Sequence, residues 1–279
     1  MARLLITGGS SYLGQHLLPL ASPTHETSYT FFTHDPIQAG AAYRLDVCDA
    51  TAVDELVKRL KPEIIIHTAG SNRSADMFNV ITTGTRHIAQ AAQTAGARLI
   101  HISTDVVFDG QDAPYGEDAP RTPIHDYGRA KGETENIVGK HPDHAIVRTS
   151  LIYGLQIMDR GTAWVVESLG SGQPVTLFND QRRNPVWANT LSLACLELAV
   201  NDYQGILNVA GDQILTRAEF GVRMLDWWGV ADRSSLSIGP SDHKKWPADC
   251  TLDLNRAGSL LKTPLLGVDA VLSQDHGLP

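Results

Sequence analysis

Short apolar runs rich in β-branched residues recur through the first half of the chain, each of a length typical of a buried strand. They are RLLIT (3–7), SYTFFT (28–33), EIIIHTAG (63–70), ARLIHIST (97–104) and HAIVRTS (144–150). Segments with helical spacing lie between them, namely ATAVDELVKRL (50–60), NVITTGTRHIAQAAQTAG (79–96) and YGRAKGETENIVGK (127–140). Strands that alternate with helices in this way predict an α/β fold, a Rossmann-type doubly wound parallel sheet with helices on both faces.

The alternation loosens after about residue 150, which predicts a domain boundary there. We expect residues 1–150 to form the Rossmann domain and residues 151–279 to form mainly a smaller, partly interleaved lobe that closes over a substrate. A helical segment and a short strand follow at 188–200 and 205–211, and residues 186–204 are expected to pack back on the first domain. Ligands of such sheets bind beyond the carboxyl ends of the strands, so candidate residues are sought there.

Composition and charge exclude several classes of partner. Hydrophobic residues make up 42% and charged residues 19% of the 279 positions, as in a folded soluble domain. The formal net charge of −8 disfavours broad binding to nucleic acid or to anionic membranes, because such binding needs a basic face. No apolar run is long enough to span a bilayer, and the opening MARLLITGGS lacks the pattern of a signal peptide. We therefore expect a cytoplasmic protein without nucleic-acid or membrane partners.

No catalytic metal is expected from the metal-ligating residue types. Cys48, Cys195 and Cys250 are widely separated, fit no metal-ligand spacing and cannot all pair, which suits a reducing compartment. The histidines at 67, 87 and 101 lie in strand or helix patterns without ligand spacing.

The stretch ITGGSSYLG (6–14) links the first predicted strand to a first helix. Gly8 lets the chain leave the strand tightly, and Gly14 lets the helix pack close to the sheet. Backbone amides at such a helix start bind a phosphate when no side chain blocks the approach. Ser11 stands where glycine is usual, but a position just inside a helix has negative φ, and the serine hydroxyl could itself donate to a phosphate. The predicted cofactor-binding residues of this turn are Gly8, Ser10, Ser11, Tyr12, Leu13 and Gly14.

The tip of the second predicted strand bears on which nicotinamide dinucleotide is bound. An acidic residue there would hydrogen-bond the ribose of NAD, but FFTHDP places Thr33 and His34 at the tip and Asp35 just beyond it. A 2′-phosphate meets less repulsion without an acid at the tip. The pattern therefore favours NADP and leaves NAD open.

Tyr127 has a lysine four residues later, in YGRAK, so Tyr127 and Lys131 would share one face of a helix. The ammonium would lower the pKa of the phenol from its usual value of about 10. Such a phenol can exchange a proton with a carbinol oxygen while the nicotinamide moves a hydride. Ser103 and Thr104 fall at the carboxyl end of a central strand, where a hydroxyl could hold the reacting carbonyl beside Tyr127.

Four stretches, TGGSSYLG (7–14), STDVVFDG (103–110), YGRAK (127–131) and VRTSLIYG (147–154), carry a resemblance to a known family. They resemble the motifs of the extended short-chain dehydrogenases/reductases, and most closely those of the dTDP-4-dehydrorhamnose reductase branch. LDVCDA and VTLFNDQRRNP are similar to the same branch, so the resemblance covers nearly the whole chain. It implies an NAD(P)-dependent reductase acting on a keto group of a nucleotide-linked sugar, with residues 1–150 as the NAD(P)-binding domain.

The resemblance also implies roles for individual residues. Thr104, Tyr127 and Lys131 would form the catalytic triad, and Lys131 would also hold the nicotinamide ribose. The pair at 46–47 would face the adenine, and the loop 69–71 would run beside the cofactor. Beyond the glycine turn, the predicted cofactor-binding residues are Thr33, His34, Asp46, Val47, Ala69, Gly70, Ser71, Ser103, Tyr127 and Lys131.

The chain departs from the branch at two positions near the sugar. Val106 stands where a tyrosine is common, and Leu151 stands where a tryptophan is common. The loss of two aromatic surfaces predicts a substrate other than dTDP-4-dehydrorhamnose itself. The resemblance favours Arg182 and Arg183 as a clamp for a nucleotide diphosphate. The predicted substrate-binding residues are Asp105, Val106, Leu151, Arg182 and Arg183.

Two other functions stay open. The first is a sugar-nucleotide epimerase; a dehydratase is disfavoured because Thr104 is followed by Asp105 and Val106 rather than by an Asp-Glu pair. The second is a non-catalytic, NADP-binding regulatory subunit like the methionine adenosyltransferase beta subunit, which resembles the same reductases. The expected small-molecule partner is a nucleotide sugar, and a homodimer is an open prediction for the assembly.

Overall fold

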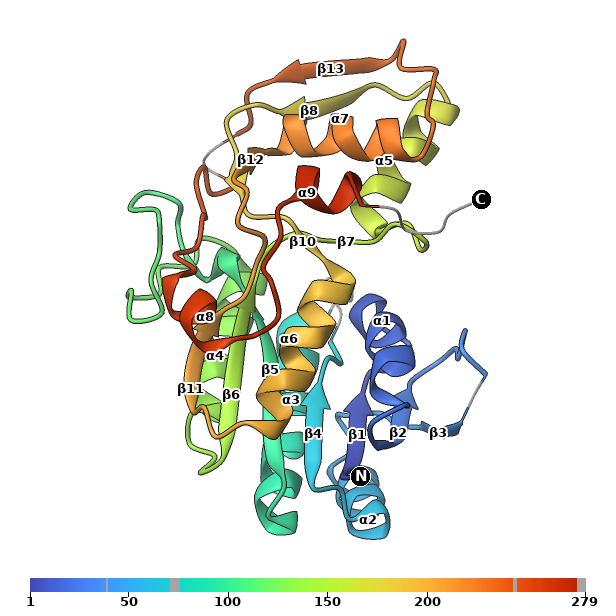
Figure 1. Ribbon diagram of the computed structural model, residues 1–279, viewed down its shortest axis with the longest axis vertical. Coiled ribbons are helices and arrows are strands. Elements are labelled where there is room, and N and C mark those ends of the chain that lie inside the picture. The colour runs from blue at the N-terminus through green and yellow to red at the C-terminus, as the bar shows by residue number, and fades with distance from the viewer. Residues whose placement is uncertain (39, 71–75, 243–244, 275–279) are drawn as a thin grey trace.

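The computed structural model describes residues 1–38, 40–70, 76–242 and 245–274 (Figure 1). Seven strands form one parallel sheet. They are β1 (Arg3–Thr7), β2 (Glu26–Phe31), β3 (Ala41–Arg44), β4 (Ile64–His67), β5 (Arg98–Thr104), β6 (His144–Thr149) and β11 (Gly205–Asn208). Their order across the sheet is β11-β6-β5-β4-β1-β2-β3, so the strand order reverses between β1 and β4. The predicted doubly wound parallel sheet is confirmed.

Helices cover both faces of the sheet, because the strands are apolar on both sides. Leu4 and Ile6 of β1 pack in one core with α1 (Tyr12–Ala21) and α6 (Ala188–Val200). Leu5, between them, packs in the opposite core. The helices of that second core are α2 (Ala50–Leu60), α3 (Met77–Ala95) and α4 (Asp126–Val138). Successive residues of a strand point to opposite faces, which is why one apolar run supplies both cores.

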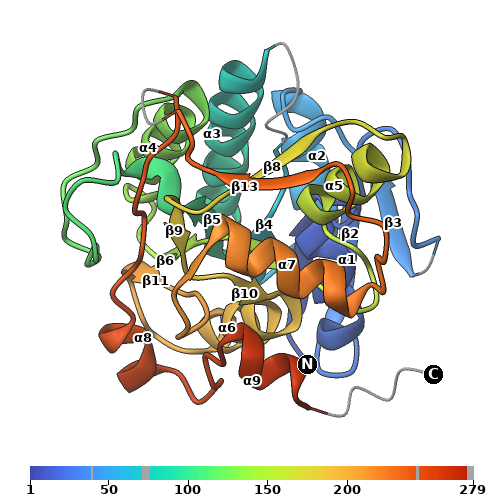
Figure 2. The ribbon, with the colours of Figure 1, turned by 90° about the horizontal axis from the view of Figure 1, so that it is seen from above.

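A second lobe lies beyond the carboxyl ends of the sheet strands (Figures 1 and 2). Its elements are α5 (Arg160–Gly170), β8 (Val175–Phe178), β9 (Arg182–Arg183), β12 (Leu215–Thr216), α7 (Arg217–Trp227), β13 (Leu236–Gly239) and α9 (Val268–Leu272). Strands β8 and β13 pair in parallel, and α5 and α7 pack on them through a core of their own. Short connecting elements join the two parts, namely η1 (Asp105–Val107), β7 (Ile152–Tyr153), β10 (Val186–Trp187) and α8 (Asn255–Leu260).

The chain leaves the first domain and returns to it. After β8 and β9, helix α6 packs against α1, and β11 adds to the sheet edge beside β6, with Gly205 opposite Ala145 and Asn208 opposite Arg148. Two details differ from the sequence prediction. Strand β2 runs over Glu26–Phe31 rather than 28–33, and β3 was not predicted, because its four residues lie at the sheet edge and are only partly buried.

Candidate chemistry of other kinds is sparse in the part of the chain that the structure describes. None of its helices is long and apolar enough to cross a membrane. Cys195 and Cys250 are buried free thiols, and Cys48 is a partly buried one. Over the same residues, no three His, Cys, Asp or Glu side chains gather as a group that could hold a metal ion.

Two buried histidines stack on each other beneath the carboxyl edge of the sheet. His67 and His101 are register partners on β4 and β5, and their ring centroids lie 5.4 Å apart. The His67 ring nitrogens hydrogen-bond to the hydroxyls of Thr7 (2.7 Å) and Thr85 (3.1 Å). Burial, and secondarily the charge of Lys131, lowers the pKa of His67 to about 3 and the pKa of His101 well below its usual value. Both rings are therefore neutral in the folded protein.

These depressed pKa values predict a loss of stability in mild acid. Below about pH 6.5 the two imidazoles bind protons in the unfolded chain but stay neutral in the folded chain. The free energy of unfolding therefore falls as the pH drops from about 6.5 toward 3. Between pH 7 and 5.5 each histidine should contribute a loss of about 1 kcal/mol. Urea unfolding at the two pH values measures it, and His67→Gln should lose about 1 kcal/mol less than the wild type over this interval. An equal loss in both proteins would contradict the assignment.

Candidate active site

The glycine-rich turn after β1 approaches the backbone after β4 closely. Gly8 has a φ of +74°, and a Cβ there would lie 2.7 Å from the backbone nitrogen of Ala69. A Cβ on Gly14 would lie 2.5 Å from the carbonyl oxygens of Gly8 and Gly9. Both glycines are therefore required by backbone packing, and the turn is left open to a ligand.

Ser11 is the N-cap of α1, one position before the helix rather than inside it. Its φ is −68°, and its Oγ accepts a hydrogen bond from the amide of Gly14 at 3.0 Å. The same Oγ lies 2.9 Å from the hydroxyl of Thr68, which itself donates to the carbonyl oxygens of Thr7 and Gly8 at 3.0 Å each. Serine is a preferred N-cap residue, which explains why it replaces glycine here. Its hydroxyl is used inside the protein and braces the turn, so the phosphate donors of the turn are backbone amides.

A cavity of about 520 Å³ opens at the carboxyl ends of β1, β2 and β4. Half of the predicted cofactor residues meet there, although the sequence separates them by up to 62 positions. The lining residues that the sequence predicted are Gly8, Ser10, Ser11, Thr33, Asp46, Val47, Ala69 and Gly70. The volume is within the usual range of about 300–1,000 Å³ for ligand pockets, and the glycine turn opens onto it, so these residues fit a dinucleotide. We call this space the dinucleotide cavity.

Three further predicted cofactor residues, Tyr12, Leu13 and His34, do not line this cavity. His34 is exposed and does not line the dinucleotide cavity. Leu13 is buried in the core, and the hydroxyl of Tyr12 donates to the carbonyl oxygen of Ile157 at 2.9 Å. Both can offer a ligand only their backbone amides, which have no helical acceptor in the first turn of α1. Ser71 lies outside the described residues.

Thr104 ends β5 and is followed by the single turn η1. Its hydroxyl lies 3.2 Å from Oδ1 of Asp105 and 3.4 Å from the amide of Val106. Asp105 is buried, accepts a hydrogen bond from the hydroxyl of Ser150 at 2.7 Å and forms an ion pair with Arg183 at 3.5 Å. Asp105 therefore orients the threonine hydroxyl and joins β5, β6 and the second lobe at this point.

Tyr127 and Lys131 lie one turn apart in α4, as predicted. The helix begins beside η1, because Gly128 has no side chain and its backbone lies against the carbonyl oxygen of Val106. Lys131 is buried, and its Nζ donates to the carbonyl oxygen of Ile102 at 2.8 Å. Glycine is therefore needed directly after Tyr127, since a side chain at position 128 would push Tyr127 away from the end of β5.

The pKa of Tyr127 differs from the sequence prediction. Burial, and then the negative charge of Asp105, raises the pKa of Tyr127 to about 12. Burial lowers the pKa of Lys131 to about 8, partly opposed by the charge of Glu135. The expected lowering of the phenol pKa by the ammonium is wrong for this structure, because desolvation of the phenolate outweighs it. A phenol of this kind is fully protonated at neutral pH and suits a proton donor.

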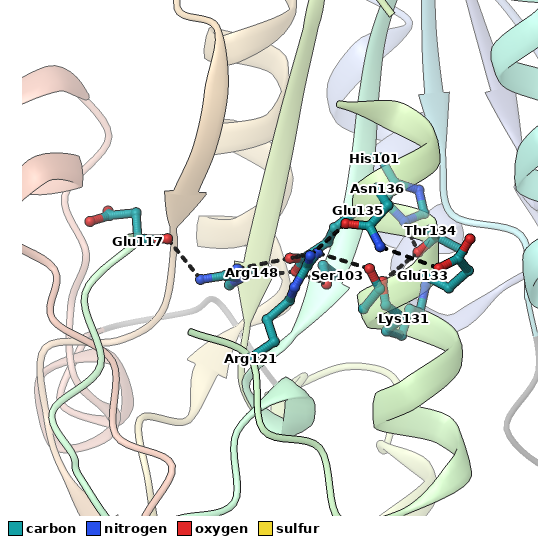
Figure 3. A network of polar contacts seen from close by, with 11 residues as sticks. His101, Ser103, Glu117, Arg121, Lys131, Glu133, Thr134, Glu135, Asn136 and Arg148 are labelled. Carbon is teal, nitrogen blue, oxygen red and sulfur yellow. Dashed lines mark hydrogen bonds and ion pairs between the residues drawn. The ribbon is translucent and has the colours of Figure 1, made fainter. Parts of the chain in front are cut away.

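Ser103 points away from the site, into a buried ion network (Figure 3). Its hydroxyl donates to Oε1 of Glu135 at 2.6 Å, and Arg148 donates to both oxygens of Glu135 at 2.9 and 2.8 Å. Arg121 adds a further ion pair to Glu135 at 3.1 Å. The Glu135 and Arg148 side chains are only 1% and 2% exposed. Of the two hydroxyls at the end of β5, Thr104 is thus the one left for a ligand.

Arg183 also has a structural role that the sequence did not reveal. Its guanidinium donates to the carbonyl oxygens of Arg182, Pro247 and Ala248 at 2.6 to 3.2 Å, besides its ion pair with Asp105. Arg182 is exposed and lies 3.7 Å from a carboxylate oxygen of Asp249. The predicted clamp of two free arginines is therefore not formed by these side chains.

A second, smaller cavity of about 150 Å³ lies within the second lobe and includes the predicted residue Leu151. Arg217, the first residue of α7, lines it opposite Asp159 and Leu177. In the described part of the chain its guanidinium has no hydrogen bond or ion pair, and burial followed by the charge of Arg183 lowers its pKa. The sequence analysis missed Arg217. Its only signal is the capping box that begins with Thr216, which marks a helix start but not a site.

A family model and several curated proteins match most of the chain. The family model described as the RmlD substrate binding domain matches residues 2–259. The dTDP-4-keto-6-deoxy-D-glucose reductase of Streptomyces niveus is 30% identical over 217 residues, which are 74% of this chain and 72% of the relative. The methionine adenosyltransferase 2 subunit beta of Xenopus tropicalis is 28% identical over 243 residues, 80% of this chain and 71% of the relative.

Solved structures share the fold over nearly the whole length. A hypothetical dTDP-4-dehydrorhamnose reductase from Sulfolobus tokodaii aligns with a TM-score of 0.82 and 28% identity, covering 96% of this chain and 97% of that one. The dTDP-4-dehydrorhamnose reductase from Bacillus anthracis, solved in complex with NADP, aligns with a TM-score of 0.79 and 23% identity over 94% of both chains. The chain therefore belongs to the RmlD substrate-binding domain family, within the extended short-chain dehydrogenases/reductases that its motifs resemble.

Proposed function

We propose that this protein is an NAD(P)-dependent reductase that acts on a keto group of a nucleotide-linked sugar. One observation carries the proposal: Thr104, Tyr127 and Lys131 gather at the carboxyl edge of the sheet that also bears the dinucleotide cavity. Two of its relatives are named as a dTDP-4-keto-6-deoxy-D-glucose reductase and a dTDP-4-dehydrorhamnose reductase, which are reductases of such sugars. The nicotinamide, when bound, supplies the hydride.

Each residue of the triad has a defined task in this proposal. The Thr104 hydroxyl donates its single proton to Oδ1 of Asp105 at 3.2 Å. In the proposal it turns that proton to the carbonyl oxygen of the substrate and so holds this oxygen beside Tyr127. The Tyr127 hydroxyl gives its proton to that oxygen, which its raised pKa of about 12 allows by keeping it protonated. Lys131 uses one hydrogen of its ammonium on Ile102 and keeps two for the nicotinamide ribose. As its pKa is about 8, loss of its proton above that pH removes the charge that favours the tyrosinate.

NADP is the proposed cofactor, and NAD stays a second candidate. The carboxylate of Asp35 is turned back on its own domain, where it accepts hydrogen bonds from the hydroxyl of Tyr29 at 2.8 Å and from the amide of Ile37 at 3.1 Å. Among the described residues no acid of this loop lines the dinucleotide cavity, which Thr33 reaches from two residues beyond the end of β2. A ribose 2′-phosphate therefore meets little repulsion there.

We propose that residues 151–279 mainly bind the substrate and that the Arg217 cavity takes an anionic part of it. At about 150 Å³ the cavity has room for a phosphate or a single ring rather than for a whole nucleotide sugar. The Arg217 guanidinium is partly buried and forms no hydrogen bond or ion pair with a described residue, although the charges of Asp159 and Asp105 attract it. Burying such a group without hydrogen-bond acceptors is costly, so its presence favours an anionic ligand such as the diphosphate. In the proposal Arg217 replaces the predicted clamp of Arg182 and Arg183.

Replacing Arg217 by glutamine should raise KM for the nucleotide sugar about 10- to 100-fold while kcat changes little, because a charge-assisted hydrogen bond is lost equally from ground and transition states. The free energy of unfolding should change little, since no described residue forms a hydrogen bond or ion pair with the guanidinium. Arg223→Gln on the same helix, whose arginine pairs with Asp269, is the matched control. An unchanged KM in Arg217→Gln would remove the cavity from the substrate site.

A screen of nucleotide-4-ketosugars with NADPH and NADH tests the proposed function through the fall in nicotinamide absorbance. We expect hydride consumption with at least one sugar, and slow reaction with dTDP-4-dehydrorhamnose made in place, because Val106 and Leu151 offer no aromatic surface to a pyranose. Sugar interconversion without net cofactor consumption would identify an epimerase. Cofactor binding without any turnover would favour the regulatory subunit.

A further inference from the structure

The first turn of α5 lies between the two cavities. Arg160, its first residue, lines the dinucleotide cavity, whereas Asp159, Gly161 and Thr162 line the Arg217 cavity. Arg160 belongs to the second lobe, and every other described residue lining the dinucleotide cavity belongs to the first domain. It is also the only cationic side chain among those residues, which include the acids Asp46 and Asp76.

Arg160 is available to a ligand. Its side chain is exposed, and within the described residues its guanidinium forms no hydrogen bond or ion pair. Three residues earlier, the carbonyl oxygen of Ile157 accepts the hydrogen bond from the Tyr12 hydroxyl at 2.9 Å. Because Tyr12 is the first residue of α1, this hydrogen bond holds the segment before α5 beside the start of α1. The backbone amides at that start can bind a phosphate.

The turn that carries Arg160 is stiff. Oδ1 of Asp159 accepts hydrogen bonds from the amides of Gly161 at 2.9 Å and Thr162 at 3.0 Å, and its Oδ2 accepts from the Thr162 hydroxyl. Asp159 is buried, so this cap is shielded from water. A ligand that fixes Arg160 therefore also fixes the residues that form one wall of the Arg217 cavity.

We propose that Arg160 binds the pyrophosphate of the dinucleotide from the second lobe, so that cofactor binding fixes the first turn of α5 and shapes the substrate cavity behind it. The pyrophosphate then lies between the amides at the start of α1 and a guanidinium across the cavity, which also offsets the acids that line it. This inference rests on the proposed use of a nicotinamide dinucleotide.

Calorimetric titration of the purified protein with NADP and, separately, with NAD tests the contact. Arg160→Gln should weaken both cofactors by a similar factor, about 10- to 100-fold, because both carry the pyrophosphate. Arg160→Lys should recover part of the loss, since it keeps the charge but not the planar fork. Arg86→Gln removes an equally exposed arginine from α3, outside the dinucleotide cavity, and should leave both affinities unchanged.

Hydrogen exchange gives a second readout that does not depend on catalysis. Saturating NADP should slow amide exchange in residues 157–163 of the wild type, and at equal occupancy the slowing should be much smaller in Arg160→Gln. Unchanged affinities in Arg160→Gln would overturn the inference while leaving the proposed function intact. Loss of NADP affinity alone would overturn it too, because it would assign Arg160 to the 2′-phosphate. Failure of the wild type to bind either cofactor would overturn both proposals.

Discussion

Replacing Tyr127 by phenylalanine should lower turnover by about two to four orders of magnitude, the usual contribution of a positioned general acid. The variant keeps the ring and loses only the hydroxyl, which makes no hydrogen bond within the described residues. Removing it therefore leaves no protein group without its partner. Steady-state kinetics with the best ketosugar of the screen would measure the loss.

The same variant should keep its affinity for NADP within a few-fold, because the dinucleotide cavity is lined by other residues. The midpoint temperature of thermal unfolding should be nearly unchanged, since the lost hydroxyl belongs to a partly buried side chain and has no hydrogen-bond partner among the described residues. Tyr43→Phe, on the edge strand β3, controls for the general effect of losing a phenol. Turnover near that of the wild type would remove Tyr127 from the proton transfer and bring the non-catalytic alternative forward.

Replacing Glu135 by glutamine should destabilise the protein by about 3–5 kcal/mol, the usual cost of breaking a buried ion pair. The change leaves the guanidinium of Arg148, 2% exposed, without a counter-charge and weakens the acceptor of the Ser103 hydroxyl (Figure 3). Since the charge of Glu135 raises the pKa of Lys131, that pKa should also fall further below about 8. Denaturant unfolding measures the first effect, and the pH dependence of turnover measures the second.

Glu133→Gln is the matched control on the same helix. Its carboxylate is exposed and accepts a hydrogen bond from Asn136 at 3.2 Å, so its replacement should cost less than about 0.5 kcal/mol. A Glu135→Gln variant as stable as this control would show that the network contributes no net stability. The joint change of Glu135 and Arg148 to apolar residues should recover much of the loss, because no buried charge would then stand alone.

The sequence predicted the framework because the framework is local. Strand and helix periods, the glycine turn and the four-residue spacing of Tyr127 and Lys131 depend on neighbours within one or two turns. The parallel order of strands follows from their alternation with helices, so the carboxyl edge and the residues along it could be predicted as well. The cavity accordingly gathers residues named from separate motifs, from Gly8 to Gly70.

The sequence could not show which group each side chain at that edge binds. Ser103 and Thr104 are adjacent and both carry a hydroxyl, and strand pleating points the two side chains to opposite faces of the sheet. Only the folded structure shows that the Ser103 hydroxyl bonds to Glu135 and the Thr104 hydroxyl lies beside Asp105. Arg183 lies in the predicted motif, yet carbonyl groups 64 and 65 residues along the chain occupy its guanidinium.

Arg160 and Arg217 each line a cavity and form no hydrogen bond or ion pair with any residue that the structure describes. Both stand at helix starts that carry no sequence signature of a site. The residues that surround each of these arginines lie far from it in the sequence, and for this reason the sequence did not reveal which arginines are unpaired. Local patterns determine which residues form an element and which face is buried, but whether a charge is paired or free depends on contacts between distant segments. The sequence by itself therefore determined the sheet, the turn, and the places of Thr104 at the end of β5 and of Tyr127 and Lys131 one turn apart in α4. The packing of the second lobe over the first decided which charges remain for a ligand.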